Sequence, residues 1–504
     1  MTAKTLMIQG SSSSAGKSLL VTALCRIYAR GGIRVAPFKA QNMSNNAAVC
    51  ADGSEIGRAQ ALQAVAAGLS PTVDMNPILI KPEADSRSQI ILMGRPWRTL
   101  EARTYYEKKA ILWQSVTAAL ERLRASYELV IIEGAGSPAE LNLHANDIVN
   151  MAVACFAHSP VLLVGDIDRG GIFAQLLGTL WLLQDEERAL VRGFLVNKFR
   201  GDLSLFKDGV NILEQKGNVP VLGVIPYLHG LYLPDEDAVA VEVSASSDHK
   251  PVSAASIEIV VLSLPRIANF DDFDSLRSES DISVRYVSSV KEFGQPDAVI
   301  IPGTKSTMAD LDWLRKTGLA EAIVQFAHDG GAVVGICGGY QMLGETILDP
   351  EQVESTVRST EGLRLLPMQT RFLAEKSTYQ VSAILCRNND WLDAIAGQQV
   401  KGYEIHMGVT TARGGWLEIT KRNGEAAHTL DGAMSGDGRI WGCYLHGIFA
   451  NDDFRRAWLH GLGWRADSGT SSHVELFQQS LDELANAVES SLDMDKLEKI
   501  IWES

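Results

Sequence analysis

Short, uninterrupted hydrophobic runs alternate with helical patterns through the first half of the chain. The runs predict strands at 6–8, 33–38, 129–132, 161–164, 194–196 and 221–225. Between the first two runs, Leu20, Leu24 and Ile27 recur on one face and predict a helix over 17–30. Hydrophobic runs without alternation, separated by helices, are typical of a parallel sheet covered on both faces.

A second series of the same kind follows. Its predicted strands lie at 257–262, 282–287, 298–301, 332–336 and 440–445. Residues 236–255 between the two series are rich in Asp, Glu, Ser and Ala and predict a linker. We therefore expect an α/β protein with two tandem domains, at 1–235 and 256–460, each with a mainly parallel sheet covered by helices. Amphipathic patterning predicts a helical C-terminal tail at 461–504.

Composition supports a globular chain. Its 504 residues are 46% hydrophobic and 21% charged, which suits two or three folded domains. The formal net charge of −15 disfavours general nucleic-acid binding, which needs clustered cations. Basic residues nevertheless exceed acidic ones from Arg26 to Lys109. This local excess is compatible with a small anionic substrate or with an ordinary solvated surface.

Cysteine usage and hydropathy indicate the compartment. The six cysteines form no CxxC pair, so neither a zinc site nor a disulfide scaffold is indicated. The first residues lack the hydrophobic core of a signal peptide. The longest hydrophobic stretch, at 149–164, is too short and polar to span a bilayer. We expect a cytoplasmic protein with no membrane or nucleic-acid partner, and its oligomeric state stays open.

A phosphate-binding loop follows the first predicted strand. The sequence GSSSSAGKS at residues 10–18 joins that strand to the predicted helix, as such a loop requires. Backbone N–H groups of small residues turn inward around phosphates, so we expect Gly10, Ser13 and Gly16 to bind ATP. Lys17 would reach the β- and γ-phosphates, and the Ser18 hydroxyl would ligate Mg²⁺. The loop is one residue longer than the common GxxxxGK[ST] form.

Carboxylates near this loop are candidate Mg²⁺ ligands. Glu133 ends the predicted strand 129–132, and Asp52 precedes a glycine. A helix-capping role for Glu133 and a turn-forming role for Asp52 are about equally compatible with the pattern. Asn197 and Lys198 end another strand, where they are candidates to contact the nucleotide base or to form a surface loop.

The second half carries a candidate nucleophile. The sequence GICGGYQ at residues 335–341 has the form G-x-C-x-G directly after a predicted strand. Such a turn is strained, so its neighbours must be small, and it places the Cys337 sulfur at the top of the sheet, beside a helix N-terminus that favours thiolate. Adjacent N–H groups form a candidate oxyanion hole. His446, at the end of a predicted strand, is the better candidate base, and His406 is the alternative.

Together these motifs resemble a known family. The second half resembles class I glutamine amidotransferases, and the first half resembles the P-loop enzymes of the dethiobiotin-synthetase group, which share the lengthened loop. In this order the halves resemble the enzymes that amidate cobyrinic and cobyric acids in cobalamin synthesis. The supporting segments are APFKAQNMS at 36–44, GRAQ at 57–60, DMNP at 74–77, GDIDRGG at 165–171, PGTK at 302–305 and GYEIH at 402–406.

The resemblance implies a reaction and its reactants. Cys337 would release ammonia from glutamine with His446 as base, and ATP with Mg²⁺ would activate an acceptor carboxylate as an acyl phosphate. The implied acceptor is a polycarboxylate corrin, adenosylcobyrinic acid a,c-diamide, amidated four times at b, d, e and g to adenosylcobyric acid. Lys39, Gln41 and Asn42 follow the second strand and are expected to contact substrate or γ-phosphate.

One departure and three alternatives stay open. Many class I amidotransferases place a Glu two residues after the catalytic His, where this chain has Ile448; Glu404 is a candidate replacement. The nearest alternative function is cobyrinic acid a,c-diamide synthase, which amidates an earlier corrin. A P-loop switch or partitioning ATPase is disfavoured because serines occupy 11–14, where such proteins use an extra Lys. A degenerate pseudo-amidotransferase is disfavoured by the intact Cys337 and His446.

Overall fold

The computed structural model describes residues 2–84, 87–234, 257–386, 390–465 and 471–503. These residues form two compact units. The first unit takes residues 1–43, 55–233 and 477–504, and the second takes 44–54 and 234–476. The predicted linker at 236–255 lies outside the described residues. The two units are therefore not the simple tandem domains that the sequence predicts. Residues 44–54 belong to the second unit, and the chain from 477 onward belongs to the first.

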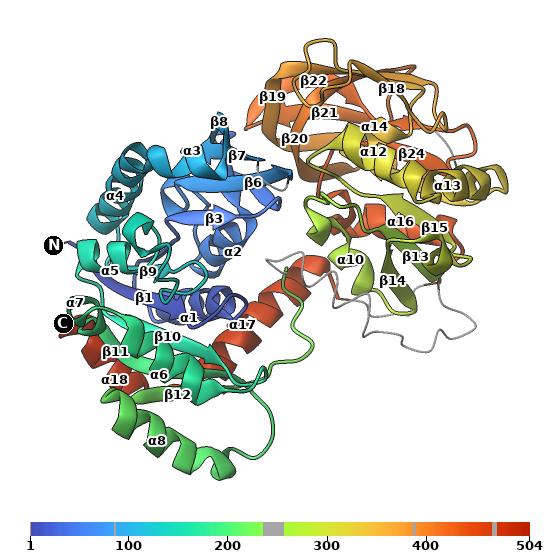
Figure 1. The fold of residues 1–504 in the computed structure, drawn as a ribbon. Coiled ribbons are helices and arrows are strands. Elements are labelled where there is room, and N and C mark those ends of the chain that lie inside the picture. The colour runs from blue at the N-terminus through green and yellow to red at the C-terminus, as the bar shows by residue number, and fades with distance from the viewer. Residues whose placement is uncertain (1, 85–86, 235–256, 387–389, 466–470, 504) are drawn as a thin grey trace. The chain divides into compact units, whose positions relative to one another are not determined.

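A six-stranded parallel sheet is the centre of the first unit, in the order β12-β11-β10-β1-β9-β2 (Figure 1). All of its neighbouring strands run parallel, as the unalternating hydrophobic runs predicted. The strands are β1 (Lys4–Gly10), β2 (Val35–Phe38), β9 (Leu129–Glu133), β10 (Val161–Asp166), β11 (Val191–Phe199) and β12 (Val221–Pro226).

Helices cover both faces of this sheet. On β11, Leu195 lies in the hydrophobic core with residues of α1, while a Cβ at Gly217 of α8 would meet the ring of the neighbouring Phe194. Successive strand residues point to opposite faces, so α1 and α8 lie on opposite sides. The helices of this unit are α1 (Lys17–Arg30), α2 (Arg58–Ala66), α3 (Ala102–Glu107), α4 (Lys109–Ser126), α5 (Met151–Ala157), α6 (Ile172–Leu182), α7 (Asp185–Arg188) and α8 (Lys207–Gly217).

A smaller sheet follows β2 in the chain, in the order β3-β6-β7-β8. The strand β3 pairs parallel with β6, and the other pairs are antiparallel. The bounds are β3 (Gln41–Met43), β6 (Ile78–Ala84), β7 (Arg87–Leu92) and β8 (Arg95–Glu101), and the short strand β5 covers Glu55–Gly57.

The C-terminal helices complete the first unit. They are α17 (His473–Ser491) and α18 (Met494–Trp502), and they confirm the predicted amphipathic helices. Leu481 and Leu497 are fully buried in the same core as Leu24 of α1. Arg26 on α1 pairs with Asp482 at 2.8 Å. The last segment of the chain therefore covers the sheet that begins with its first residues.

We expect Leu481→Ala to lower the free energy of unfolding of the first unit by about 2–5 kcal/mol, because it leaves a cavity in a closed core. Denaturant unfolding followed by circular dichroism checks this value. Glu483→Ala, an exposed position on the same helix, is the matched control. An equal effect of both variants would contradict the packing role of α17.

The second unit also has a six-stranded sheet, in the order β14-β13-β15-β16-β24-β23. All pairs are parallel except β23 with β24. The strands are β13 (Ile257–Leu262), β14 (Ile282–Val287), β15 (Ala298–Ile301), β16 (Ala332–Ile336), β23 (Ala433–Met434) and β24 (Ile440–Cys443). The helices are α10 (Asp274–Arg277), α11 (Val290–Phe293), α12 (Thr307–Lys316), α13 (Leu319–His328), α14 (Gly338–Met342), α15 (Asp390–Asp393) and α16 (Asp452–Gly461).

A second, mostly antiparallel sheet lies between β16 and β24 in the chain (Figure 1). Its order is β18-β17-β19-β21-β22, and β20 pairs with β19. The strands are β17 (Thr346–Leu348), β18 (Ser359–Glu361), β19 (Met368–Leu385), β20 (Gln399–Ala412), β21 (Leu417–Arg422) and β22 (Glu425–Asp431), while the short strand β4 (Ala47–Val49) comes from residues 44–54. None of its strands is among those predicted from the hydrophobic runs.

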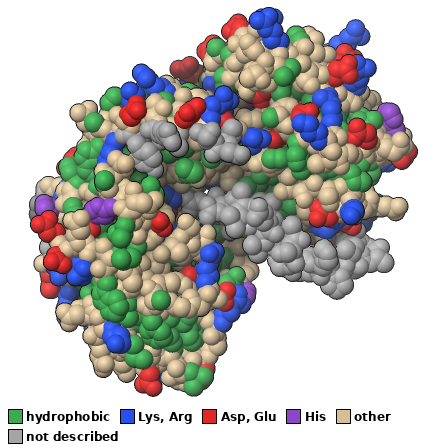
Figure 2. All heavy atoms as spheres, viewed as in Figure 1, with side chains coloured by type: hydrophobic (Ala, Val, Ile, Leu, Met, Phe, Trp, Pro, Cys, Tyr) green, Lys and Arg blue, Asp and Glu red, His purple; other side chains and the backbone are tan. Residues whose placement is uncertain are grey.

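Charged side chains of both signs lie on the surface. On the face shown in Figure 2, Lys and Arg side chains are interspersed with Asp and Glu rather than gathered into a continuous basic area. Within the described part of the chain, every helix falls short of the length and hydrophobicity that crossing a membrane demands.

Candidate active sites

The phosphate-binding loop of the first unit is tightly closed. It runs from Gly10, at the end of β1, to Gly16, directly before α1, and Ser13 is exposed in it. Gly16 has a φ of +95°, and a Cβ there would lie 2.1 Å from the side-chain nitrogen of Asn197. The positive φ and the lack of space for a Cβ both require glycine at this position. Asn197 donates from Nδ2 to the carbonyl of Ala15 at 2.9 Å, so in this structure it holds the loop.

Two lysines bring positive charge to the loop. The Nζ of Lys17 donates to the backbone carbonyls of Ser12 and Gly136, both at 3.2 Å. The Nζ of Lys198 donates to the carbonyl of Ser14 at 2.8 Å. Ammonium groups against a loop of backbone amides are suited to bind a polyphosphate.

Glu133, at the end of β9, connects the predicted metal ligand Ser18 to the predicted substrate-binding residue Lys39. Its Oε1 accepts hydrogen bonds from the Ser18 hydroxyl and the Lys39 ammonium, both at 2.8 Å. Its Oε2 accepts from Nε2 of Gln63 at 2.5 Å and of Gln60 at 3.4 Å. The carboxylate is fully buried, and these donors offset the cost of burying its charge.

The two glutamines in this cluster were not predicted. Gln60 and Gln63 are three residues apart on α2, so they share one face of a helix that is otherwise largely Ala, Leu and Val. Polar side chains at that spacing on a buried face are the signal that could have identified them. Asn42 joins the cluster because its Nδ2 donates to Oε1 of Gln60 at 3.1 Å.

Gln41 lines a pocket in the first unit. The pocket measures about 190 Å³, and its wall includes Tyr105, Gly136 and Asn150. The Tyr105 hydroxyl donates to Oε1 of Gln41. Since the carbonyl of Gly136 also accepts from Lys17, one wall of this pocket is tied to the phosphate-binding loop.

Asp52 does not belong to the Glu133 cluster. It lies in the second unit, where its Oδ1 accepts from the backbone N–H of Ser54 at 3.0 Å, a turn-forming contact. No three His, Cys, Asp or Glu side chains among the described residues gather into a metal-binding group. Ser18 and Glu133 fit Mg²⁺, which takes most of its other ligands from phosphate and water.

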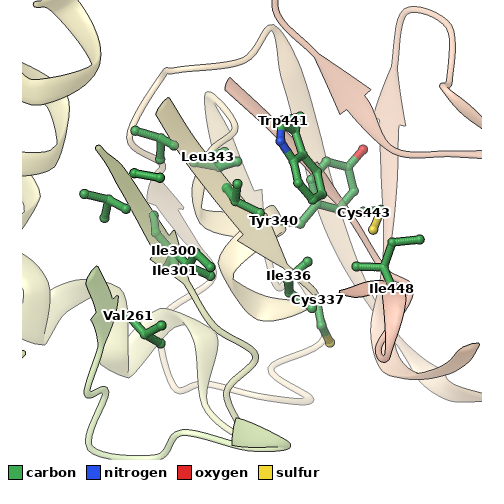
Figure 3. Packing of buried hydrophobic residues seen from close by; sticks show 14 of the residues in the cluster. Val261, Ile300, Ile301, Ile336, Cys337, Tyr340, Leu343, Trp441, Cys443 and Ile448 are labelled. Atoms are coloured by element: carbon green, nitrogen blue, oxygen red, sulfur yellow. The ribbon is translucent and has the colours of Figure 1, made fainter. Parts of the chain in front are cut away.

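The predicted elbow is present at the end of β16. Cys337 follows Ile336 there, and its φ of +51° is the strained left-handed value (Figure 3). A Cβ at Gly339 would lie 1.9 Å from the carbonyl oxygen of Ile301, so this neighbour must be glycine. The following helix, α14, has only 5 residues. The helix-dipole contribution that the sequence led us to expect is therefore confined to a single turn.

His446 follows β24 and is almost completely buried. Its Nδ1 lies 2.6 Å from Oδ2 of Asp272, and Cys337 is near enough to its imidazole to raise the pKa of His446. The Asp272 carboxylate also accepts from the backbone N–H of Gly447 at 2.9 Å. The geometry is that of a Cys-His-Asp triad, with the acid on a segment far from both partners in sequence.

The charge balance in this triad favours the protonated imidazole. Burial disfavours the charged form of His446, but the nearby Asp272 and Cys337 outweigh burial and raise its pKa to about 10. Gly303 of the PGTK segment packs directly against the imidazole, since a Cβ there would lie 2.8 Å from Cε1 of His446. An imidazolium beside the sulfur is the partner that a thiolate nucleophile needs.

The other candidates have different partners. Glu404 is bound by the Arg422 guanidinium at 2.9 and 3.1 Å, so Asp272 and not Glu404 orients His446. The Nδ1 of His406 lies 2.8 Å from the carbonyl of Gly408, and burial lowers the pKa of His406 to about 3. A histidine with so low a pKa is too weak a base to take the role of His446.

Comparison with known proteins agrees with this pair of sites. Residues 6–238 match the family described as the CobQ/CobB/MinD/ParA nucleotide binding domain, and residues 258–454 match the CobB/CobQ-like glutamine amidotransferase domain. The chain is 54% identical to "Cobyric acid synthase" of Chloroflexus aggregans over 98% of this chain and 99% of that one. It is 53% identical to the protein of the same name from Herpetosiphon aurantiacus, over 99% of each chain. The chain belongs to the cobyric acid synthase family of glutamine-dependent amidating enzymes.

Proposed function

We propose that this enzyme converts adenosylcobyrinic acid a,c-diamide to adenosylcobyric acid by amidating its b, d, e and g carboxylates with nitrogen from glutamine. The observation that carries the proposal is the presence of two chemically complete sites in one chain. One holds the Cys337–His446–Asp272 triad, and the other holds the phosphate-binding loop with Lys39 and Glu133. The near full-length similarity to named cobyric acid synthases supports the choice of corrin.

The triad is suited to release ammonia from glutamine. The Cys337 sulfur attacks the side-chain amide carbon, and backbone N–H groups beside the elbow stabilise the oxyanion. The C–N bond then breaks as Nε2 of His446 delivers its proton to the leaving nitrogen. A thioester and ammonia result, and water releases glutamate from the thioester. Asp272 keeps the imidazole in the orientation that serves both proton transfers.

The first unit is suited to activate the acceptor. A carboxylate is a poor electrophile, so transfer of the γ-phosphoryl group of ATP to a corrin carboxylate supplies the acyl phosphate that ammonia attacks. Lys17 and the loop amides would bind the phosphates, and Lys39 would bind either the acceptor carboxylate or the transferred phosphoryl group. Ammonia displaces phosphate, and the carboxylate becomes an amide.

Ser18 and Glu133 are the residues that would hold Mg²⁺ beside these phosphates. The ion would supply charge neutralisation of the polyphosphate. Lys39 shares Oε1 of Glu133 with Ser18, so it would lie beside the same phosphates. The pocket lined by Gln41 is the proposed entry for the acceptor carboxylate.

Mass spectrometry of the corrin product tests the proposed reaction directly. Each step replaces a carboxylate oxygen with nitrogen, so the mass change counts the amidations. The purified enzyme is incubated with ATP, Mg²⁺, glutamine and either cobyrinic acid or its a,c-diamide. We expect amidation of the diamide in four steps. Conversion of cobyrinic acid to the diamide, with no further reaction, would instead identify a cobyrinic acid a,c-diamide synthase.

We expect Asp272→Asn to lower glutamine hydrolysis on the order of 10²- to 10⁴-fold, because the amide stabilises neither the imidazolium nor the required tautomer. Amidation with added ammonium should continue at the wild-type rate. Glutamate release and corrin mass are the two measurements, and Asp274→Asn is the matched control two residues away. Full glutamine hydrolysis by the Asp272 variant would remove Asp272 from the triad.

A further inference from the structure

The GRAQ and DMNP segments, at 57–60 and 74–77, meet beside Lys39 in the first unit. Lys39 is the first residue beyond β2, because the pairing of β2 with β9 ends at Phe38. Its ammonium nevertheless lies 2.8 Å from Oε1 of Glu133, and the residue is only 5% exposed. A lysine outside the sheet needs another anchor to keep its long side chain in one place.

The DMNP segment supplies that anchor. The backbone N–H of Lys39 donates to the carbonyl of Met75 at 2.8 Å, and the carbonyl of Lys39 accepts from Nδ2 of Asn76 at 2.9 Å. Met75 ends the single turn η1 (Val73–Met75), and Pro77 confines Asn76 to an extended backbone, with a φ of −150°. Two successive residues therefore bind both backbone groups of Lys39.

The partners of Asn76 fix the orientation of its amide. The backbone N–H of Gly57 donates to Oδ1 of Asn76 at 3.1 Å, and since an N–H can only donate, the amide oxygen must lie on this side. The NH₂ group then donates to the carbonyls of Lys39 and Ile78, at 2.9 and 3.0 Å. Asn76 is 1% exposed, so it cannot turn without leaving buried polar groups unpaired.

Two helices hold Asn76 and its segment in place. Gly57 directly precedes α2, and a Cβ there would lie 2.9 Å from Oδ1 of Asn76, so glycine permits the close approach. The guanidinium of Arg122, on α4, pairs with the Asp74 carboxylate at 2.7 Å. Asn76 thus links the strand end that carries Lys39 to α2, while the residue pair on α4 steadies the turn before it.

Resting on the function proposed above, we propose that Asn76 is the positioning residue for Lys39. It holds the backbone of Lys39 so that the ammonium reaches the acceptor carboxylate or the transferred phosphoryl group. Asn76 contacts neither reactant and acts through the lysine. A shift of about 1 Å in a group that binds the reacting atoms can cost about 10²-fold in rate, so the loss of this anchor should be visible in catalysis.

A double-mutant cycle with ammonium as the nitrogen source tests this role. We expect Asn76→Ala to lower the rate of corrin amidation, followed by mass, about 10- to 100-fold. Asn76→Asp keeps the acceptor for Gly57 but loses both donors, so it should lower the rate at least as much. In a Lys39→Ala background, Asn76→Ala should cost less than about two-fold more, because no ammonium is left to position.

The affinity for ATP separates positioning from folding. Lys17 and the loop at 10–18 are unchanged in these variants, so the dissociation constant of ATP, measured by calorimetry, should stay within about three-fold of the wild-type value. Ser159→Ala is the matched control. It removes another fully buried hydrogen-bonding side chain from the first unit and should leave both the rate and the ATP affinity unchanged.

Three results would overturn the proposal. They are a wild-type rate in Asn76→Ala, a loss equally large in the Lys39→Ala background, and a loss of ATP binding along with activity; the last two would show that Asn76 only supports the fold. Amidation of cobyrinic acid in place of its diamide would overturn the proposed acceptor and not Asn76. The four rates of the cycle are compared on whichever corrin the wild-type enzyme amidates.

Discussion

Cys337→Ser is expected to lose glutamine-dependent amidation by about 10³-fold or more while amidation driven by added ammonium continues. The serine hydroxyl fits the elbow, but it ionises far less readily than a thiol and is a much weaker nucleophile beside His446. External ammonia bypasses this step, because only the acyl phosphate in the first unit has to be formed. Corrin mass with glutamine and with an ammonium salt gives the two rates.

The matched control for this variant is Cys386→Ser, which changes a half-buried cysteine in the same unit away from the elbow. It should retain both nitrogen sources. Loss of ammonium-driven amidation in the Cys337 variant would show that Cys337 does more than supply ammonia. Retention of glutamine-driven amidation would place the nucleophile elsewhere.

Sequence patterns predicted the features that depend on neighbouring residues. The elbow at Cys337 was predictable because a strained turn demands small flanking residues, and those residues are adjacent in the chain. The phosphate-binding loop was predictable for the same reason, and Ser18 with Glu133 followed from the meeting of strand ends at one edge of a parallel sheet. The parallel core sheets follow from uninterrupted hydrophobic runs.

Features that depend on distant residues were missed. Asp272 is 174 positions from His446, and an acid in an Asp-Asp pair carries no spacing that connects it to a histidine. The antiparallel sheet around β19 was missed because this strand alternates buried and exposed positions, whereas the predicted strands rest on uninterrupted hydrophobic runs. Helix α17 was expected from its amphipathic pattern, but the pattern does not specify that its hydrophobic face covers the first unit.

Each compact unit includes a segment from the other half of the sequence. The first unit is completed by the C-terminal helices, and the second unit incorporates residues 44–54. Neither catalytic half is therefore a contiguous piece of the chain, and cutting at the predicted linker would separate each half from part of its own fold. Variants of the full chain are the appropriate way to separate the two activities.

Lys17→Ala is expected to lower ATP-dependent amidation on the order of 10²- to 10³-fold with either glutamine or ammonium, because the site loses the lysine that would bind the β- and γ-phosphates. Glutamine hydrolysis should survive, since the triad lies in the other unit. Corrin mass and glutamate release measure the two activities, and Lys207→Ala, an exposed lysine on α8, is the matched control. Unchanged ammonium-driven amidation would show that the loop at residues 10–18 does not bind the reacting phosphates. The opposite outcomes of Cys337→Ser and Lys17→Ala with ammonium are what assign nitrogen release to one site and carboxylate activation to the other.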